Sequence, residues 1–342
     1  VTGGAGWLGR RLVGALTEGN PALGGVGGGG RRVRCLVQAG DSPDDLRNLG
    51  AEIVAGDTRD PDACKALLAG AAGGLLVHLA GVIHPDRRTR SFQQVNVEGT
   101  AAVLAAARAA GIRRLVAMSS NSPFGRNPTP DHVFTEDSPY NPYMGYGRSK
   151  WRMELLLRAA ADGGDGPEIV IVRAPWFYGP GQPPRQTAFF TMIKNGRFPL
   201  MGKGGNRRSM GYVDSLALGI LLAAANDRAA GQIYWLADAR PYTMAEIVDT
   251  VKATLEADFG MQVAERNLSV PSAVSDLARL ADRALQGVGL YHQKIHVLSE
   301  MNQTIACDIG KARRELGFEP IVDLREGMRR SIEWCLNDNQ MI

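Results

Sequence analysis

The sequence predicts an α/β fold in which a doubly wound, mostly parallel sheet is joined to a smaller C-terminal lobe. Short apolar runs typical of buried strands alternate with stretches whose apolar residues recur at helical spacing. A glycine-rich turn stands at the very start, directly before the first helical stripe. Beyond residue 181, glycines and prolines break up the alternation, as expected of a second and smaller lobe.

The bulk composition is that of a globular protein. The 342 residues suit one large or two unequal domains, with 44% hydrophobic and 22% charged residues. The net charge of +4 is small and the arginine pairs are scattered, which argues against a nucleic-acid partner. No apolar run approaches the roughly 20 residues of a membrane helix, and no signal peptide is visible. We therefore expect a cytoplasmic protein without a membrane partner.

The cysteines give no sign of a metal or redox site. Cys35, Cys64, Cys307 and Cys335 lack the spacing of either kind. Reduced thiols in a cytoplasmic protein are the simplest account, and no metal is expected. Val1 reads as the last residue of a strand, so we expect the sequence to begin inside its first element.

The turn after Val1 has glycines at positions 3, 6 and 9. A helical stripe follows, formed by Leu8, Leu12, Val13 and Leu16. Such a turn lets the backbone approach a pyrophosphate and aims a helix N-terminus at it. The turn therefore predicts a dinucleotide site. The glycine run at residues 24–30 lacks this context and is predicted to be a flexible loop.

The next strand, Arg32–Val37, ends at Gln38. In this fold the residue at that strand end meets the adenosine ribose, where an acid favours NAD and an arginine favours NADP. Gln38 is neither, so the choice between NAD and NADP stays open, with a lean towards NAD. Glu52–Ala55 is the following strand, and it leads into the polar segment 56–60.

Two more strands are predicted at Leu75–Leu79 and Ile112–Met118, with a helix over residues 95–110 between them. His78 lies in an apolar run and reads as a core histidine. His84 reads as a loop residue. Later strands are predicted at Glu168–Val172 and Gln232–Leu236.

Tyr146 and Lys150 are four residues apart, which places them on one helix face. A phenol with a pKa of about 10 is a poor base at neutral pH. A nearby ammonium favours phenolate, so we expect Lys150 to lower the pKa of Tyr146. Ser119 and Ser120 follow the run 112–118, where an open parallel sheet binds its ligands. Tyr-x-x-x-Lys alone is common, but this order of motifs is specific.

The combined motifs resemble the extended short-chain dehydrogenase/reductases, a family that includes NAD-dependent epimerases and dehydratases. The resemblance runs over almost the whole chain. It implies a Rossmann-type NAD(P)-binding domain over 1–175, to which 211–238 returns, and a discontinuous, mainly substrate-binding lobe over 176–342. Relatives often dimerise through helices like those at 96–110 and 146–160, which leaves a homodimer open.

The resemblance also assigns the site. It implies that Ser120, Tyr146 and Lys150 are catalytic, with Ser120 holding the substrate oxygen. In segment 56–60 the first acid, Asp57, would sit by the adenine amino group, although a simple Asx turn competes with this interpretation. Asn96 matches a helix asparagine that supports the lysine and a water chain. The predicted cofactor-binding residues are Gly3, Gly6, Trp7, Leu8, Gly9, Gln38, Asp57, Thr58, Leu79, Ala80, Gly81, Asn96, Tyr146, Lys150 and Pro175.

Four residues are predicted to contact the substrate. Ser122 follows the catalytic serine. Arg207 and Arg208 lie in a segment that resembles one in which an arginine reaches a substrate phosphate; a solvated loop charge is the alternative. Trp176 stands where the family commonly has an asparagine that binds the nucleotide diphosphate, so packing and substrate contact are both open for it. Asp214 is predicted to cap the helix that follows, and Thr243 the next one.

The expected function is NAD(P)-dependent oxidation or reduction at a carbinol or keto carbon. We favour a nucleotide-sugar epimerase or related sugar-modifying enzyme, because of the Gly179-Pro180-Gly181 and 206–214 segments. The family's 4,6-dehydratases carry Thr-Asp-Glu where this chain has Ser120-Asn121-Ser122, so the acid and base for water elimination are absent. A one-way reductase or 3β-hydroxysteroid-type dehydrogenase is the alternative, favoured by Trp176 and Gln38. A non-catalytic cofactor-binding regulator is a third, against which the complete Ser/Tyr/Lys set argues.

Overall fold

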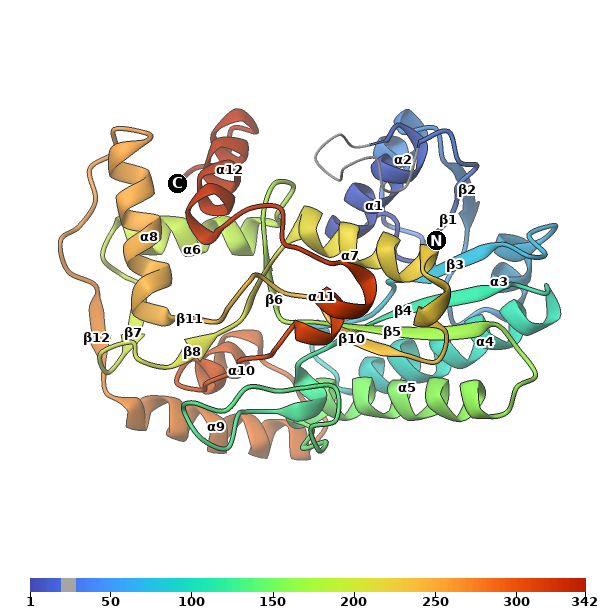
Figure 1. Ribbon diagram of the computed structural model, residues 1–342. Helices are drawn as coiled ribbons and strands as arrows, with labels where there is room; N and C mark the ends of the chain where they lie inside the picture. Colours follow the sequence, from blue (N-terminus) through green and yellow to red (C-terminus); the bar gives the residue numbers. More distant parts are fainter. Residues whose placement is uncertain (20–28) are drawn as a thin grey trace.

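The computed structural model describes residues 1–19 and 29–342 and confirms the predicted α/β fold (Figure 1). The glycine-rich loop predicted at residues 24–30 falls largely outside the described residues. The predicted boundaries of the two domains stay a prediction.

A parallel sheet forms the centre of the N-terminal part. Its strands are β1 (Arg34–Val37), β2 (Glu52–Ala55), β3 (Leu75–His78), β4 (Arg114–Ser120), β5 (Glu168–Ala174) and β10 (Ile233–Trp235). Thr2 forms parallel bridges to Leu36 of β1 and to His78 of β3. The order across the sheet is therefore β2-β1-Thr2-β3-β4-β5-β10, with parallel pairing throughout this series.

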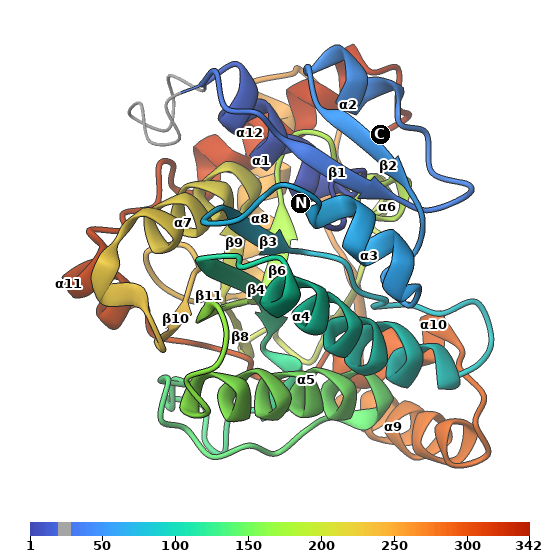
Figure 2. The same cartoon turned by 90° about the vertical axis from the view of Figure 1, so that its right-hand side faces the viewer.

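Helices cover both faces of this sheet because successive side chains of a strand point to opposite sides. Val116 and Met118 of β4 pack with α1 (Trp7–Thr17), α7 (Val213–Ala225) and α11 (Gly310–Leu316). Leu115 and Ala117 pack on the other side with α3 (Pro61–Leu68), α4 (Thr100–Ala109) and α5 (Met144–Asp162). Figure 2 shows α7 and the α3–α5 layer on opposite sides of the strands. The short helix α2 (Asp44–Asn48) follows β1.

The C-terminal lobe has a core of its own. Helices α6 (Pro184–Lys194), α8 (Met244–Ala257) and α12 (Leu324–Asn337) share one apolar cluster. The described part of the chain also has three pairs of short strands after residue 175: β6 (Trp176–Tyr178) with β9 (Met210–Tyr212), β7 (Pro199–Met201) with β12 (Leu268–Val270), and β8 (Arg207–Arg208) with β11 (Tyr242–Thr243). Helix α9 (Ser272–Gly287) lies along the lower edge of Figure 1, and α10 (Gln293–Glu300) packs against it, just above in this view.

Some predicted elements differ in detail. The helix predicted at 95–110 is a π-helical turn over Phe92–Gly99 followed by α4. Thr243 caps α8 as predicted, since its hydroxyl accepts from the N–H of Glu246. Asp214 does not cap α7, which begins one residue earlier at Val213. Its carboxylate instead accepts two hydrogen bonds from Arg11 on α1, at 2.5 and 2.7 Å, and fastens α1 to α7.

A buried ion pair joins α5 to the ends of β4 and β5. Arg173 of β5 donates to the carboxylate of Glu154 on α5 at 2.7 Å, and both side chains are almost fully buried. The same carboxylate accepts from Ser119 at 2.5 Å and from Tyr140 at 2.7 Å. The guanidinium carbon of Arg173 lies 4.4 Å from the ring centre of Phe124. Each charge is thus paired and hydrogen-bonded, the condition under which burial of charge is tolerated.

We expect Glu154→Gln and Arg173→Met each to lower the free energy of unfolding by about 3–5 kcal/mol, because each leaves one buried charge without its partner. Urea denaturation measures both losses. The double variant leaves neither charge behind, so its loss should be clearly smaller than the sum of the two. Additive losses would show that the two side chains are not coupled.

Candidate active site

The predicted serine, tyrosine and lysine meet at the carboxyl end of β4. Ser120 ends the strand, and Tyr146 and Lys150 lie one turn apart near the start of α5, which packs beside it. The Ser120 hydroxyl lies close enough to the phenol of Tyr146 to lower the pKa of Tyr146. The Nζ of Lys150 donates to the carbonyl of Met118 on β4 at 2.8 Å. All three predicted catalytic side chains are buried.

Burial governs how these groups ionise. It raises the pKa of Tyr146 to about 12, and the Ser120 hydroxyl offsets only part of this effect. Burial also lowers the pKa of Lys150 to about 8. The carboxylate of Glu154 acts in the opposite direction and raises this pKa, but its effect is smaller. This differs from the expectation that Lys150 brings the pKa of Tyr146 down: burial governs that pKa, and Lys150 is not among the groups that shift it. At neutral pH the phenol is therefore a proton donor.

Asn96 connects the catalytic helix to the turn after β3. Its amide donates to the carbonyl of Val82 at 3.0 Å and to the hydroxyl of Ser149 at 2.9 Å. Its Oδ1 accepts from the N–H of Val82 at 2.8 Å. The asparagine lies within the π-helical turn, a feature that recurs at functional sites. It fixes the backbone beside Gly81, where an added Cβ would lie 3.5 Å from the Nζ of Lys150.

The glycine turn forms a tight cradle at the same edge of the sheet. Gly3 has a φ of 71°, and a Cβ there would lie 2.7 Å from the amide nitrogen of Ala80. A Cβ on Gly9 would lie 2.2 Å from the carbonyl oxygen of Gly3. Gly6 precedes the first residue of α1. The turn therefore presents bare backbone and a helix N-terminus, which suits a pyrophosphate.

Most of the other predicted cofactor residues follow the carboxyl ends of strands, at the same edge of the sheet. The N–H groups of Leu79 and Ala80 donate to Thr2, which precedes the turn. Leu8 and Pro175 are buried, Pro175 between β5 and β6, and Thr58 is buried after β2.

The side chain of Trp7 turns towards the lobe. Its Nε1 donates to the carbonyl of Pro180 at 2.7 Å, and its ring centre is 6.2 Å from that of Phe177. This contact joins the glycine turn to the Gly-Pro-Gly loop, so both segments border the same site.

A cavity of 640 Å³ opens at the carboxyl ends of β1 and β2, lined in part by Gln38, Arg47, Asp57 and Arg59. Arg59 donates twice to Asp57, at 2.7 and 2.9 Å, which holds the pKa of that carboxyl below its ordinary value. Arg47 pairs with Asp44 at 3.1 Å. The predicted adenosine residues Gln38 and Asp57 thus line one cavity, whose two arginines each have an acidic partner.

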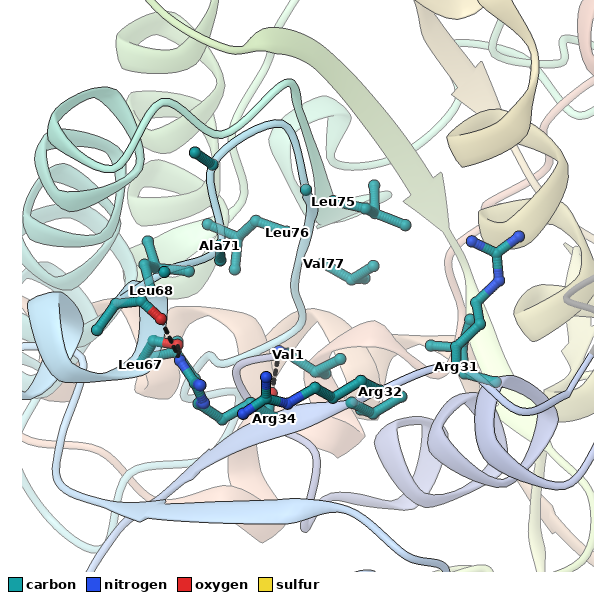
Figure 3. A pocket seen from close by; sticks show the side chains of 16 residues that line it. Val1, Arg31, Arg32, Arg34, Leu67, Leu68, Ala71, Leu75, Leu76 and Val77 are labelled. Atoms are coloured by element: carbon teal, nitrogen blue, oxygen red, sulfur yellow. Dashed lines mark hydrogen bonds between the residues drawn. The ribbon is translucent and has the colours of Figure 1, made fainter.

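A second cavity, of 430 Å³, lies at the opposite edge of the sheet (Figure 3). It is lined by Leu75 and Leu76 at the start of β3 and by the end of α3. Arg34 donates to the carbonyls of Leu67 and Ala69 there, at 2.9 and 2.8 Å. Because the predicted catalytic residues lie at the carboxyl edge, this cavity is separate from the candidate site.

The predicted substrate residues separate into two groups. Ser122 is buried beside Ser120, with the two hydroxyl oxygens 3.3 Å apart. Trp176 instead donates to the side chain of Gln186 at 3.0 Å and packs edge-on against Phe189.

Both predicted phosphate-binding arginines contact backbone. Arg207 donates to the carbonyls of Pro130 and His132, at 2.9 and 3.2 Å. Arg208 donates to the carbonyl of Glu300. The structure thus gives each guanidinium a backbone partner, and the role predicted for it in phosphate binding stays a prediction.

Several side chains near Tyr146 were not predicted from the sequence as site residues. The ring centre of Phe92 is 6.0 Å from that of Tyr146 and 5.8 Å from that of Tyr291. The hydroxyl of Tyr291 lies 2.5 Å from the Nδ1 of His84. Burial, and then the charge of Arg185, lower the pKa of His84 to about 4. These residues come from distant parts of the chain, so no local sequence pattern joins them.

Both histidine predictions agree with the structure. His84 is a loop residue, and His78 is buried between Thr2 and Thr100.

The model of the NAD dependent epimerase/dehydratase family matches residues 1–237. The chain belongs to this family. It is 55% identical over 340 residues to the uncharacterized protein y4nL of Sinorhizobium fredii, covering 99% of this chain and 95% of the relative. It is 28% identical to a 4-hydroxy-2-methyl-3-oxo-4-farnesyl-3,4-dihydroquinoline-1-oxide ketoreductase of Stigmatella aurantiaca, covering 96% and 93%. Its structure resembles that of the dTDP-glucose 4,6-dehydratase DesIV from Streptomyces venezuelae, solved with NAD bound, with a TM-score of 0.74, 28% identity and coverage of 99% and 96%.

Family membership confirms the resemblance drawn from the motifs. The protein is an NAD(P)-dependent enzyme of the extended short-chain dehydrogenase/reductase type. Within residues 1–19 and 29–342, no three His, Cys, Asp or Glu side chains are grouped as a metal site. No helix in that part of the chain is long and apolar enough to cross a membrane.

We expect Lys150→Met to be more stable than the wild type at pH 7, by about 1–3 kcal/mol, although it removes a predicted catalytic group. The folded pKa of about 8 lies below the ordinary 10.5. The stability linked to the neutral amine is therefore present above pH 10.5 and is lost as pH falls through about 8. Thermal denaturation at several pH values should show the advantage of the variant shrinking as pH rises. A variant that melts well below the wild type at pH 7 would contradict this account of Lys150.

Proposed function

We propose that the protein catalyses reversible hydride transfer between NAD and a carbinol or keto carbon of a nucleotide-linked sugar. The hydride-transfer chemistry is supported by one observation. The hydroxyls of Ser120 and Tyr146 lie together at the carboxyl edge of the sheet, where the glycine cradle also lies. The cradle fits the cofactor because it is a tight turn that only glycines allow: a Cβ at Gly3 or Gly9 would collide with the chain's own backbone. Such a turn lets the backbone approach a pyrophosphate closely.

The two hydroxyls can address one substrate oxygen. When the carbon is reduced, neutral Tyr146 donates its proton to the carbonyl oxygen while Ser120 holds that oxygen in place. When it is oxidised, the same phenol oxygen takes the proton back, and the ammonium of Lys150 stabilises the phenolate. The bound nicotinamide supplies or accepts the hydride at the carbon. Burial keeps water from competing for the proton.

The loop after β4 favours oxidation and reduction over water elimination. Asn121 and Ser122 follow Ser120 in this loop. Neither an amide nor a hydroxyl is an acid or base of the strength that elimination needs. The similarity to a dTDP-glucose 4,6-dehydratase supports a sugar substrate, and the loop supports a different reaction on it, such as epimerisation.

Arg185 is our candidate for binding the substrate diphosphate. It is exposed at the start of α6, and its charge acts on both His84 and Tyr291 near Tyr146. Arg207 and Arg208 already hold backbone carbonyls. For Arg185, no hydrogen bond or ion pair is found within the described residues. An arginine can bind a phosphate with two parallel hydrogen bonds.

A one-way carbonyl reductase acting on a substrate without a nucleotide is the second candidate. The backbone contacts of Arg207 and Arg208 favour it, because they occupy the two arginines predicted for a phosphate. Trp176 favours it as well, since an indole replaces the amide common in the family. The similarity to a ketoreductase is consistent with this candidate.

A thermal-shift panel of NAD, NADP, nucleoside diphosphates and nucleotide sugars separates the two candidates, because a ligand that binds the native state raises its stability. We expect NAD to stabilise the protein at least as well as NADP. Stabilisation by a nucleoside diphosphate supports the sugar substrate. If none acts at millimolar concentration, the reductase is the better description.

With a substrate from this panel, Tyr146→Phe should lower kcat by about 10²–10⁴-fold, because it removes the proton donor and keeps the ring. The thermal shift by NAD should stay close to that of the wild type, which controls for folding. Near-normal turnover in Tyr146→Phe would contradict the role of Tyr146 as the proton donor.

Arg185→Ala should weaken binding of a nucleoside diphosphate by about 1.5–3 kcal/mol, the range for a hydrogen bond to a charged group. Calorimetric titration measures this loss. Arg208→Ala is the matched control, and we expect it to lower the melting temperature through the lost contact with Glu300. If Arg208→Ala alone weakens binding, the phosphate lies at β8 as the sequence first suggested.

A further inference from the structure

Helix α9 exposes two leucines and buries mostly polar side chains. Leu277 and Leu280 point outwards and are 66% and 62% exposed. Ser275, Asp282 and Gln286 point inwards and are buried. A surface helix normally has the opposite arrangement, with its apolar face towards the protein. The leucines are therefore not explained by packing within this chain.

The inner polar groups hold α9 in place without help from the leucines. The carboxylate of Asp282 lies 2.7 Å from the Nδ1 of His296 on α10 and accepts from Gln286 at 2.9 Å. The side-chain oxygen of Gln286 accepts from the N–H of Gly145 at 2.8 Å. Gly145 is the residue before Tyr146. The inner face of α9 is thus fixed to the start of the catalytic helix.

The exposed apolar surface continues beyond the end of α9. Val288 and Leu290 are 71% and 40% exposed, and Ile83 on the turn after β3 is 44% exposed. Leu290 forms an antiparallel bridge with Arg88, and the N–H of Tyr291 donates to the carbonyl of Arg87 at 2.8 Å. We call Ile83, Leu277, Leu280, Val288 and Leu290 the outer apolar surface. Leu277, Leu280 and Val288 recur at helical spacing, which places them on one side of α9. Single exposed apolar residues need no explanation, but several on one side mark a binding surface.

Basic side chains lie in the same segments. The exposed ones are Arg87, Arg88, Arg90, Arg283 and Lys294. Asp86 and Asp276 are exposed there too, and Asp276 is already paired with Arg279 at 3.2 Å. The two residues of the Arg88–Leu290 bridge are both exposed, so a cation borders the apolar group directly. Leucines bordered by arginine and lysine are typical of surfaces that lie in the headgroup region of anionic membranes.

We propose that the outer apolar surface docks this protein on the face of an anionic lipid bilayer. Tyr291 adjoins Leu290 and packs on Phe92, which packs on Tyr146. Docking by this surface therefore brings the active site to the bilayer, where a substrate that carries an apolar chain is held. The absence of a spanning helix led us to expect no membrane partner, and a surface contact needs no such helix. The proposal does not depend on the identity of the sugar.

Co-sedimentation with lipid vesicles tests this surface directly. The full chain is mixed with phosphatidylcholine vesicles, or with vesicles that also contain phosphatidylglycerol. We expect binding to the anionic vesicles, weaker binding as salt rises, and little binding to phosphatidylcholine alone. Absence of binding to anionic vesicles at low salt overturns the proposal.

Three variants locate the contact. Leu277→Ser with Leu280→Ser should weaken vesicle binding by about tenfold or more, because both side chains enter the headgroup region. Arg87→Glu with Arg88→Glu should weaken it by about fivefold per residue. Met192→Ser, at an exposed position on α6, is the matched control and should bind like the wild type. The thermal shift by NAD should be unchanged in all of them, which shows that the fold is intact.

The alternative partner for this surface is a second copy of the chain. Light scattering after size-exclusion chromatography tests this alternative. If the wild type forms a dimer that the Leu277→Ser, Leu280→Ser variant abolishes, while vesicles remain unbound, the surface is a dimer interface and the proposal is overturned. Vesicle binding that Met192→Ser weakens as strongly as the leucine variant would also overturn it. Failure of the proposed sugar chemistry changes none of these readouts.

Discussion

The buried ion pair between Glu154 and Arg173 is the interaction on which the candidate active site depends. It joins α5 to β5, and Ser119, the residue before Ser120 on β4, donates a hydrogen bond to the same carboxylate. Lys150 lies one helical turn before Glu154, so the pair fixes the distance between the catalytic helix and the catalytic strand. Two charges without water need a rigid set of partners. That rigidity is what a proton donor and an oxygen-binding serine require of their scaffold.

Burial has opposite effects on stability and on chemistry at this site. It keeps Tyr146 protonated at neutral pH and makes the charged form of Lys150 costly. A fold selected for stability alone would not place an ammonium here. The same low dielectric strengthens the influence of Lys150 on a phenolate once one forms. The site therefore favours proton donation at rest and stabilises the reverse step only as charge develops.

The features that were predicted from the sequence are those that a short local pattern specifies. The glycine turn, the strand ends and the Tyr146–Lys150 spacing each lie within a few residues, so the fold, the family and the position of the catalytic set could be inferred. Partners that meet across the chain could not. Nothing near Arg207 signals the carbonyls of Pro130 and His132, and nothing near Tyr291 signals His84. The polar inner face of α9 was equally hidden, because periodicity gives an apolar face without saying which way it points.

In the proposed reaction, hydride passes between a nicotinamide cofactor and a substrate carbon held at Ser120 and Tyr146. Isotope transfer measures this step most directly. NADH that carries deuterium at its reactive position is mixed with the protein and the keto form of a substrate, and the product is analysed by mass spectrometry. Our account predicts one deuterium on the new carbinol carbon with the wild type, and almost none with Tyr146→Phe over the same time. Product that forms without deuterium would contradict it.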